Sequence, residues 1–290
     1  GTGILSFADL KSFDEKKINL KIIRNNLSEL TSFDYIARNP ELIVDILVQK
    51  NNIFVSYLNE VKKDCYGISL VMGTINFEEI NFKKVFSPEE CVNKKNKYGE
   101  FKMVQSGGAL ATYGNDQILL TTGDYRFRDL AQNINSIFGK VLLINFKNKK
   151  YKLVSSGHRN PQGIFYDKKN NNIFLSEHGP FGGDEINIIY NPLTDIENFG
   201  WPISSYGEHY DGEFKIEAPL HDSHADYGFI EPKFYFTPSI GISDVKRDNE
   251  TFVISSMKEK TLYFIPDTAE GNITGAKSIN LDYRIRDFII

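Results

Sequence analysis

The feature that most constrains the fold is a hairpin pattern that occurs four times along the chain. Each copy has an apolar strand, a short turn rich in Asn, Asp or Lys, and a second strand rich in aromatic and β-branched residues. Alternating apolar residues around a turn of this kind predict a β-hairpin. The copies are "LIVDILVQKNNIFVSYLNE" (42–60), "ALATYGNDQILLTTGD" (109–124), "GIFYDKKNNNIFLSEH" (163–178) and "GISDVKRDNETFVISSMK" (241–258).

Further short strands, "KVLLINF", "KYKLVSS" and "TLYFIP", lie between the hairpins. Repeated four-stranded antiparallel units predict the blades of a β-propeller, which bury their sheet faces against neighbouring blades. We therefore expect an all-β fold, with one β-propeller domain over residues 1–290. A β-sandwich is the alternative. The charged segment 12–30 has room for a turn of helix but no apolar stripe at helical period.

Composition excludes two classes of partner. The 290 residues carry a net charge of −4, so no basic surface for nucleic acid is expected. No apolar run approaches the roughly 20 residues of a membrane span, which argues against membrane insertion. The first residues, "GTGILSFADL", lack a charged and then apolar leader, so the chain is either cytosolic or has lost a leader.

The two cysteines, Cys65 and Cys91, lie far apart and form no CxxC motif, which argues against a zinc or redox site. One disulfide or two inert thiols are both compatible with this spacing. The sequence favours the inert thiols.

Polar residues follow the second strand of three hairpins, at 123–124, 177–180 and 256–258. In a propeller these positions emerge at one end of the central channel. We therefore expect them to converge on one mouth, where a small-molecule site would lie.

A series of motifs points to a known family. Residues 106–288 contain, in this order, "SGGAL" before "TTGD", "FGKVLLIN", "GHRNPQG", "SEHGPFGGDEINII" followed by "NFGWP", "TPSIGIS", "SSMK" and "RIRDF". They belong to a wider resemblance that runs from about residue 42 to the C-terminus. The sequence resembles the glucose/sorbosone dehydrogenase family, soluble sugar dehydrogenases that use pyrroloquinoline quinone (PQQ). The resemblance implies a six-bladed β-propeller, an aldose sugar as substrate and a periplasmic or secreted location.

The resemblance also implies the residues that hold PQQ, a planar tricarboxylate that needs cations around it. The "RN" pair would contact the quinone carbonyls, while a lysine and two arginines would bind the carboxylates. A serine in "TPSIGIS" keeps a hydroxyl at the site, although Thr237 stands where the family commonly has an aromatic residue. These cofactor residues are Arg159, Asn160, Ser239, Lys258, Arg284 and Arg286.

Two calcium ions are implied in the same way. The backbone carbonyls of Gly179 and Pro180 match the pair that holds calcium against PQQ in the family. A second, structural ion would use Glu185 and the carbonyl of Phe199. Backbone and carboxylate oxygens suit such a hard cation.

Structural roles compete with these assignments. Arg159 and Arg286 could be buried ion-pair arginines beside Asp124 or Glu177, and Glu185 could cap a turn. The resemblance makes two histidines packed or hydrogen-bonding neighbours of the site, and three others lie in a loop-like segment where we expect solvated surface side chains. The first two are His158 and His178, and the other three are His209, His221 and His224.

The main departure from the family concerns the catalytic base. The family's base is the histidine of "HxGGRL", but this chain reads "QSGGAL", so Gln105 stands at the catalytic position and Ala109 replaces the arginine. A carboxamide cannot act as a base near neutral pH. Two functions therefore stay open: a PQQ- and calcium-dependent sugar dehydrogenase with Arg159 and Gln105 at its reaction centre, or a catalytically silent propeller that binds a small molecule or a partner.

The chain ends raise a further expectation. "RIRDFII" should be the first inner strand of a sixth blade, and "GTGILSF" resembles a strand that follows an inner hairpin. The propeller is therefore expected to be incomplete at its ends.

Overall fold

The computed structural model describes residues 4–9, 11–12, 18–30, 43–95, 100–210 and 220–290. The chain forms two compact units, Gly1–Lys94 and Lys95–Ile290, which we call unit 1 and unit 2 and describe separately. That all 290 residues form one propeller domain stays a prediction. Residue 42, the first of the first hairpin motif, lies outside the described residues.

The described residues of unit 1 form two sheets and one α-helical turn. The first sheet has the order β1-β2-β6, and the second has the order β3-β4-β5-β7 with β8 beside β5. The helical turn α1 falls within the segment 12–30, as predicted from the sequence. The elements are β1 (Leu5–Phe7), β2 (Lys21–Asn25), α1 (Leu27–Leu30), β3 (Ile43–Gln49), β4 (Asn52–Lys62), β5 (Cys65–Thr74), β6 (Glu79–Ile80), β7 (Lys83–Phe86) and β8 (Val92–Asn93).

A disulfide joins Cys65 and Cys91, so the preference for inert thiols was wrong. The reason is tertiary: β8 pairs antiparallel with the start of β5, with Cys65 opposite Asn93. This pairing brings the two cysteine Cα atoms to 5.3 Å, within the range that a disulfide spans. The separation of 26 residues along the chain does not reveal it.

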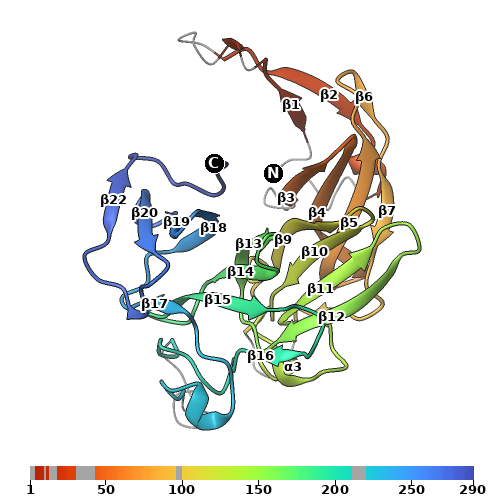
Figure 1. Cartoon of the computed structure of the whole chain (residues 1–290). Helices are drawn as coiled ribbons and strands as arrows, with labels where there is room; N and C mark the ends of the chain where they lie inside the picture. Colours follow the sequence, from red (N-terminus) through yellow and green to blue (C-terminus); the bar gives the residue numbers. More distant parts are fainter. Residues whose placement is uncertain (1–3, 10, 13–17, 31–42, 96–99, 211–219) are drawn as a thin grey trace. The chain divides into compact units, whose positions relative to one another are not determined.

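In the part of unit 2 that the structure describes there are three sheets, which we call the first, second and third sheets of the unit (Figure 1). The first has the order β16-β12-β11-β10-β9, the second β13-β14-β15-β17-β21, and the third β18-β19-β20-β22. Their strands are β9 (Gly107–Gly114), β10 (Gln117–Thr122), β11 (Lys140–Asn145), β12 (Lys150–Ser156), β13 (Pro161–Asp167), β14 (Asn172–Glu177), β15 (Asp184–Tyr190), β16 (Glu197–Asn198), β17 (Phe234–Phe236), β18 (Ile242–Asp248), β19 (Thr251–Ser256), β20 (Thr261–Pro266), β21 (Gly271–Asn272) and β22 (Lys277–Asn280). Short helices lie in the connections, among them α3 (Asp129–Gln132) and η2 (Ala225–Tyr227).

The four predicted hairpins are confirmed as β3–β4, β9–β10, β13–β14 and β18–β19, each an antiparallel pair. The three further predicted strands are confirmed as β11, β12 and β20. The all-β prediction therefore holds. Six blades of four strands each remain a prediction.

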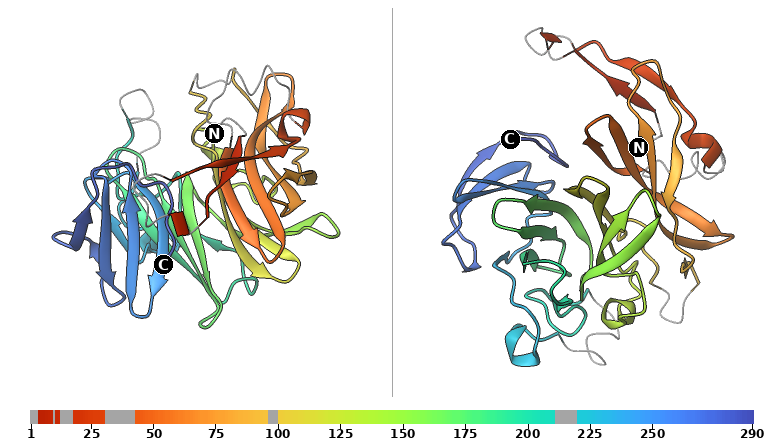
Figure 2. Two further views of the ribbon diagram at one scale, coloured as in Figure 1. Left: turned by 90° about the horizontal axis from the view of Figure 1, so that it is seen from above. Right: turned by 45° about the vertical axis from the view of Figure 1, so that its right-hand side comes forward.

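The three sheets of unit 2 pack face to face, and β14 shows how. Ile173 and Leu175 belong to a buried cluster with residues of the first sheet, whereas Phe174 between them belongs to a cluster with residues of the third sheet. Alternate side chains of a strand point to opposite faces, so both faces of the second sheet are buried. The blue third sheet lies beside the green second sheet in both views of Figure 2.

Glycine allows the inner strands to approach each other. A Cβ atom on Gly163 in β13 would lie 2.6 Å from the Cα atom of Asp244 in β18. Any larger residue would push the two strands apart. The loops at the ends of these strands are therefore held close together.

The C-terminal segment corrects one prediction. Residues 284–290 form no strand, because none of the described strands pairs with them. The segment is instead held by single contacts, such as the hydroxyl of Ser243 donating to the carbonyl of Ile285 at 2.6 Å. Arg286 is exposed, so its interpretation as a buried ion-pair arginine was wrong.

Asp244 in β18 should make unit 2 less stable as the pH rises. Burial raises the pKa of this carboxyl to about 7, and the ammonium of Lys246 offsets only part of that effect. The folded chain therefore holds a proton that the unfolded chain releases near pH 4, and the stabilisation is lost as the pH rises through 7. We expect this group to lower the free energy of unfolding by about 2–3 kcal/mol between pH 5 and pH 8.

Denaturant unfolding at both pH values checks this expectation. Asp244→Asn should remove the change of about 2–3 kcal/mol in the free energy of unfolding between pH 5 and pH 8. Asp248→Asn, which changes an exposed carboxyl on the same strand, should leave that change as in the wild type. Equal pH dependence in wild type and Asp244→Asn would contradict the assignment.

Candidate functional site

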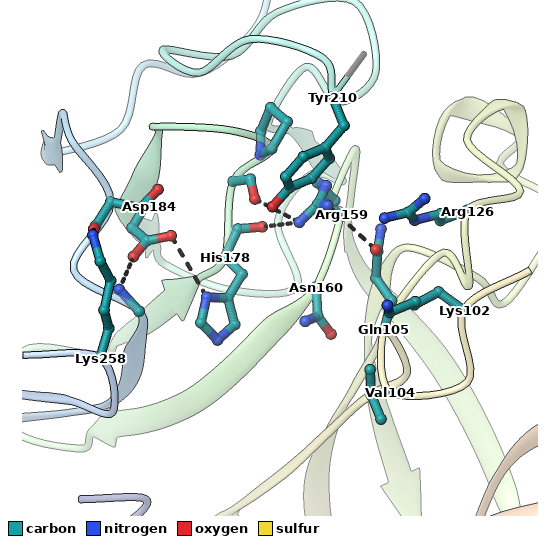
Figure 3. Close-up of a pocket in the computed structure, with 14 residues that line it drawn as sticks. Lys102, Val104, Gln105, Arg126, Arg159, Asn160, His178, Asp184, Tyr210 and Lys258 are labelled. Atoms are coloured by element: carbon teal, nitrogen blue, oxygen red, sulfur yellow. Dashed lines mark hydrogen bonds and ion pairs between the residues drawn. The ribbon is translucent and has the colours of Figure 1, made fainter. Parts of the chain in front are cut away.

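Unit 2 contains a pocket of about 440 Å³ at the ends of the hairpin strands (Figure 3). Two of the three predicted segments line it, through residues 178–180 after β14 and Lys258 after β19. Asp124, in the third predicted segment, lies behind the wall and supports it. The lining residues are Lys102, Val104, Gln105, Arg126, Arg159, Asn160, His178, Gly179, Pro180, Asp184, Tyr210, Ser239, Gly241 and Lys258.

Gln105 forms part of the pocket wall and is held on both sides of its amide. Its Nε2 donates to Oδ1 of Asp124 at 2.6 Å, and its Oε1 accepts from Nη2 of Arg159 at 3.3 Å. Only 4% of the residue is exposed. The side chain therefore connects the carboxylate of Asp124 to the guanidinium of Arg159. Its carboxamide does not accept a proton near neutral pH.

Asp124 is fully buried behind Gln105. Its carboxylate also accepts from Nε1 of Trp201 at 2.7 Å and from the backbone N–H of Arg126 at 2.8 Å. Burial raises the pKa of Asp124, while the charge of Arg159 and these hydrogen bonds lower it in part. The carboxylate of Asp124 is thus a hydrogen-bond acceptor that orients the side chain of Gln105.

Arg159 lies between the pocket and the interior. Its Nη1 donates to the carbonyls of His178 at 3.0 Å and Gly179 at 2.5 Å, and its guanidinium lies over the Trp201 ring. Burial lowers the pKa of Arg159, and the charge of Asp124 raises it in part. Arg159 thus interacts with the charge of Asp124 in the interior and also lines the pocket.

Asn160, the second residue of the "RN" pair, is fixed through its oxygen. Oδ1 accepts from the backbone N–H of Gly107 at 3.1 Å and from Nε2 of Gln162 at 3.0 Å. The amide nitrogen is then the side-chain donor that remains for a ligand.

Lys258 and Ser239 line the end of the pocket near β18. Nζ of Lys258 donates to the carbonyl of Ser239 at 2.8 Å and lies 3.5 Å from Glu259. The Ser239 hydroxyl oxygen is buried and has no hydrogen-bond partner among the described residues. Such a group is costly to bury unless a ligand or water completes it.

Arg284 and Arg286 do not line this pocket. Nη2 of Arg284 lies 3.9 Å from the sulfur of Met257, next to Lys258. Nη1 of Arg286 donates to Oε1 of Gln162 at 2.9 Å, and Gln162 in turn contacts Asn160. Each arginine therefore contacts a residue that is itself next to, or hydrogen-bonded to, a residue of the pocket lining.

His178 faces the pocket and pairs with Asp184. Its Nδ1 lies 3.5 Å from Oδ1 of Asp184, whose Oδ2 accepts from the backbone N–H groups of Gly241 at 2.7 Å and Ile242 at 3.0 Å. Burial raises the pKa of Asp184, but the hydrogen bonds from His178 and these amides hold it below its usual value. A hydrogen-bonding role for His178 is confirmed, with its ring directed into the pocket (Figure 3).

His158 has the packed role predicted for it. Its ring stacks on Phe199 and contacts Ser155 at 2.8 Å and Glu177 at 2.9 Å. The side chain is fully buried away from the pocket.

A second, smaller cavity of about 10 Å³ lies beside the pocket. It brings together the four positions predicted to hold calcium, Gly179, Pro180, Glu185 and Phe199, with Glu177 on the same wall. Burial raises the pKa of Glu185 well above its usual value, and the nearby charge of Glu177 raises it further. Two buried acids that repel each other would be stabilised by a cation.

The backbone around these positions is tight. A Cβ on Gly179 would lie 1.5 Å from the carbonyl oxygen of Gly183, so only glycine fits there. Glu185 lies inside strand β15 rather than in a turn, so the turn-cap interpretation was wrong. The carbonyl of Phe199 accepts from Nδ1 of His224 at 3.0 Å, which leaves its second lone pair for another contact.

Two of the three loop histidines are buried, which corrects the prediction of solvated side chains. His209 is 5% exposed and packs edge to face against Trp201, and His224 is 1% exposed and stacks on Tyr206. The polar sequence around them concealed this, because the segment packs back onto the "NFGWP" turn. His221 is partly exposed and stacks on Tyr227.

Six lining residues were not expected from the sequence: Lys102, Val104, Arg126, Asp184, Tyr210 and Gly241. The one available signal was the position of Arg126, two residues after the polar "GD" that follows β10. Lys102 and Tyr210 come from connections whose path only the fold reveals.

The described parts of the chain lack two features. They contain no cluster of three or more His, Cys, Asp or Glu side chains that could hold a metal ion. None of their helices is long and apolar enough to cross a membrane.

Comparisons with known proteins agree on one family. The family model described as Glucose / Sorbosone dehydrogenase matches residues 43–289. Aldose sugar dehydrogenase YliI of Escherichia coli (strain K12) is 32% identical over 47% of this chain and 38% of its own length. The uncharacterized protein slr1608 of Synechocystis sp. is 27% identical over 60% of this chain and 45% of its own. The chain thus aligns with less than half the length of these curated relatives.

Solved structures show the same fold. The apo form of the soluble aldose sugar dehydrogenase of Escherichia coli matches with a TM-score of 0.61 and 25% identity, covering 82% of this chain and 69% of that one. The PQQ-bound aldose sugar dehydrogenase of Streptomyces coelicolor matches with a TM-score of 0.68 and 16% identity, covering 98% and 78%.

Proposed function

Because the chain belongs to the glucose/sorbosone dehydrogenase family, we propose that unit 2 binds PQQ in its 440 Å³ pocket and that the protein acts on aldose sugars. The observation that carries the proposal is that one pocket is lined by Arg159, Asn160 and Lys258 and by Ser239, whose hydroxyl has no partner among the described residues. A planar tricarboxylate needs such donors and cations, and the volume suits a small cofactor.

The residues fit the cofactor unequally. Arg159 and Lys258 bring two cations to the pocket itself, and Asn160 brings an amide donor. Arg284 and Arg286 would reach a carboxylate only after their present contacts to Met257 and Gln162 are exchanged. PQQ, when bound, would supply a quinone that accepts the hydride from the sugar carbon bearing the reacting hydroxyl.

This chain's own residues would bind and orient both molecules but supply no strong base at position 105. The hydroxyl proton of the sugar must leave as the hydride leaves its carbon, and a positioned base contributes typically 10²–10⁴-fold to such a step. Gln105 offers an amide already bonded to Asp124 and Arg159. Oxidation should therefore be slow. The same observation supports the second candidate, a PQQ- or anion-binding module without activity.

Calorimetric titration with PQQ in the presence of calcium, followed by a dye-linked assay with aldoses, tests these functions. Heat at micromolar PQQ together with sugar-dependent dye reduction supports the dehydrogenase. Heat without dye reduction supports the binding module. No heat refutes a PQQ site.

Calcium fits the second cavity by the chemistry of its donors. Glu185 would supply a carboxylate and Phe199 a carbonyl, while Gly179 and Pro180 would present carbonyls toward the PQQ pocket. The carbonyl of Gly179 already accepts a hydrogen bond from Arg159, so Arg159 and the calcium ion would both contact this oxygen.

Calcium should raise the melting temperature of the PQQ-free protein. A ligand that binds only the folded chain at about a hundredfold excess over its Kd adds roughly 2.7 kcal/mol, which corresponds to about 5–10 °C for a unit of this size. Thermal unfolding in calcium and in chelator measures the shift. Glu185→Gln should lose it, whereas the exposed Glu250→Gln should keep it. An equal shift in both variants would place the ion elsewhere.

We also propose a periplasmic or secreted location. The Cys65–Cys91 disulfide supports it, because disulfides persist mainly in oxidising compartments. Mass analysis of the protein from its native host with and without reductant would test whether the bond forms there.

A further inference from the structure

Beyond the cofactor residues, the pocket has a second group of cations at its opposite end. Figure 3 shows Lys258 and Asp184 on one side, Lys102 and Arg126 on the other beside Gln105, and Arg159 between them. We propose that Lys102 and Arg126 form a subsite for an anionic group on the substrate, so that the preferred sugars are acidic ones such as uronates. This inference rests on the proposed function, because it takes the quinone to lie at Arg159 and Asn160.

Charge balance is the first observation that carries the inference. The other cations near the pocket have acidic neighbours: Arg159 has Asp124, Lys258 has Glu259, and Arg128 has Glu100 at 2.8 Å. Within the described part of the chain, no carboxylate forms an ion pair with Lys102 or Arg126. The charges of Lys102 and Arg126 thus lack an acidic partner among the described residues, and an anionic ligand could neutralise them.

Crowding of like charges is the second observation. Burial lowers the pKa of both Arg128 and Arg159, and the charge of Arg126 lowers both further, so three guanidinium groups share a small volume. The Arg126 guanidinium lies 5.6 Å from the centre of the Tyr210 ring, a contact that orients it but does not neutralise it. An anion at this point would relieve the repulsion.

Position is the third observation. Lys258 lies at the opposite end of the pocket from Lys102 and Arg126. The two C-terminal arginines lie outside the pocket, where Arg284 contacts Met257 and Arg286 contacts Gln162. A cofactor with its carboxylates toward the Lys258 end would turn its quinone toward Arg159. Lys102 and Arg126, next to Gln105, then face the molecule that reacts there. A carboxylate in place of the terminal hydroxymethyl group of a hexose would give them a partner.

Binding of paired glycosides to the PQQ- and calcium-loaded protein tests the inference without relying on turnover. Methyl β-D-glucuronide and methyl β-D-glucoside differ only in the carboxylate, and neither has a free anomeric hydroxyl to oxidise. Calorimetry should show the glucuronide binding about tenfold or more tightly. Arg126→Gln and Lys102→Gln should each reduce that preference roughly tenfold, whereas Lys168→Gln, an exposed lysine outside the pocket, should preserve it.

The outcomes separate this inference from the proposed function. Equal binding of the two glycosides, or an unchanged preference in Arg126→Gln, overturns the anionic subsite while PQQ binding stands. A loss of PQQ affinity in Arg126→Gln without sugar also overturns it, because the cation then serves the cofactor. If PQQ does not bind at all, the proposed function fails, and the same titration on the cofactor-free protein still decides the subsite by whether glucuronide binding depends on Arg126.

The dye-linked assay gives a second readout. With D-glucuronate and D-glucose as substrates, the ratio of their kcat/KM values should favour glucuronate and fall roughly 10- to 100-fold in Arg126→Gln. Added salt should lower the ratio as well, because it screens the charge pair. A ratio that favours glucose in the wild-type protein would contradict the subsite.

Discussion

Gln105→His should raise the rate of aldose oxidation by the PQQ- and calcium-loaded protein about 10²–10⁴-fold, the usual contribution of a positioned base. The structure favours this gain because the oxygen that now accepts from Gln105, Oδ1 of Asp124, lies at 2.6 Å and would accept from an imidazole N–H instead. That contact would fix the tautomer and leave the second ring nitrogen free to take the sugar proton. Stopped-flow and steady-state rates with a dye acceptor measure the change.

Two controls make the result specific. Gln105→Asn also fits the wall but offers no base, so it should not raise the rate. In the variant with histidine at position 105, the rate should increase with pH through the range where imidazole loses its proton, near 6.5. If the wild-type protein already turns over as fast as this variant, the base comes from another group and the importance assigned to Gln105 is refuted.

Arg159→Met should have the second large effect, on stability and on cofactor binding together. Removing the guanidinium leaves Asp124 buried without its cation and leaves the carbonyls of His178 and Gly179 without their donor. Breaking a buried charge pair of this kind costs about 3–5 kcal/mol. Denaturant unfolding measures the loss, and calorimetry with PQQ measures the affinity.

Arg159→Lys separates the structural role from the cofactor role. A lysine keeps the charge near Asp124, so much of the stability should return. Its ammonium lacks the planar fork of the guanidinium, so PQQ affinity should stay reduced roughly tenfold or more. If PQQ binds both variants as tightly as wild type, Arg159 is a structural arginine only.

Local pattern was sufficient for most of the strands. The hairpins β9–β10 and β18–β19 were predicted because alternation and turn residues act within a few positions of each other. The same local logic failed for residues 284–290, because a strand needs a partner and a sequence pattern does not supply one. It also failed for His224, whose polar surroundings along the chain do not reveal that it packs onto Tyr206.

The candidate site was predictable where a motif named it. Arg159, Asn160 and Lys258 came from strings of residues that resemble the family, and the fold places all three in the lining of one pocket. Whether they bind PQQ stays a prediction. The hydrogen bonds of Gln105 to Asp124 and Arg159 were not predictable from the sequence, because these partners lie 19 and 54 positions away along the chain.

The sequence by itself determined the all-β architecture, the hairpins and the glutamine at position 105, since each depends on residue identity and short-range periodicity. Only the tertiary structure decided that Cys65 and Cys91 are joined, that Asp124 supports Gln105, and that Lys102 and Arg126 face the pocket without an acidic partner among the described residues. The physical reason is that disulfides, buried hydrogen bonds and charge balance depend on distances in space. Those distances are set by how the sheets pack, not by the order of the residues alone.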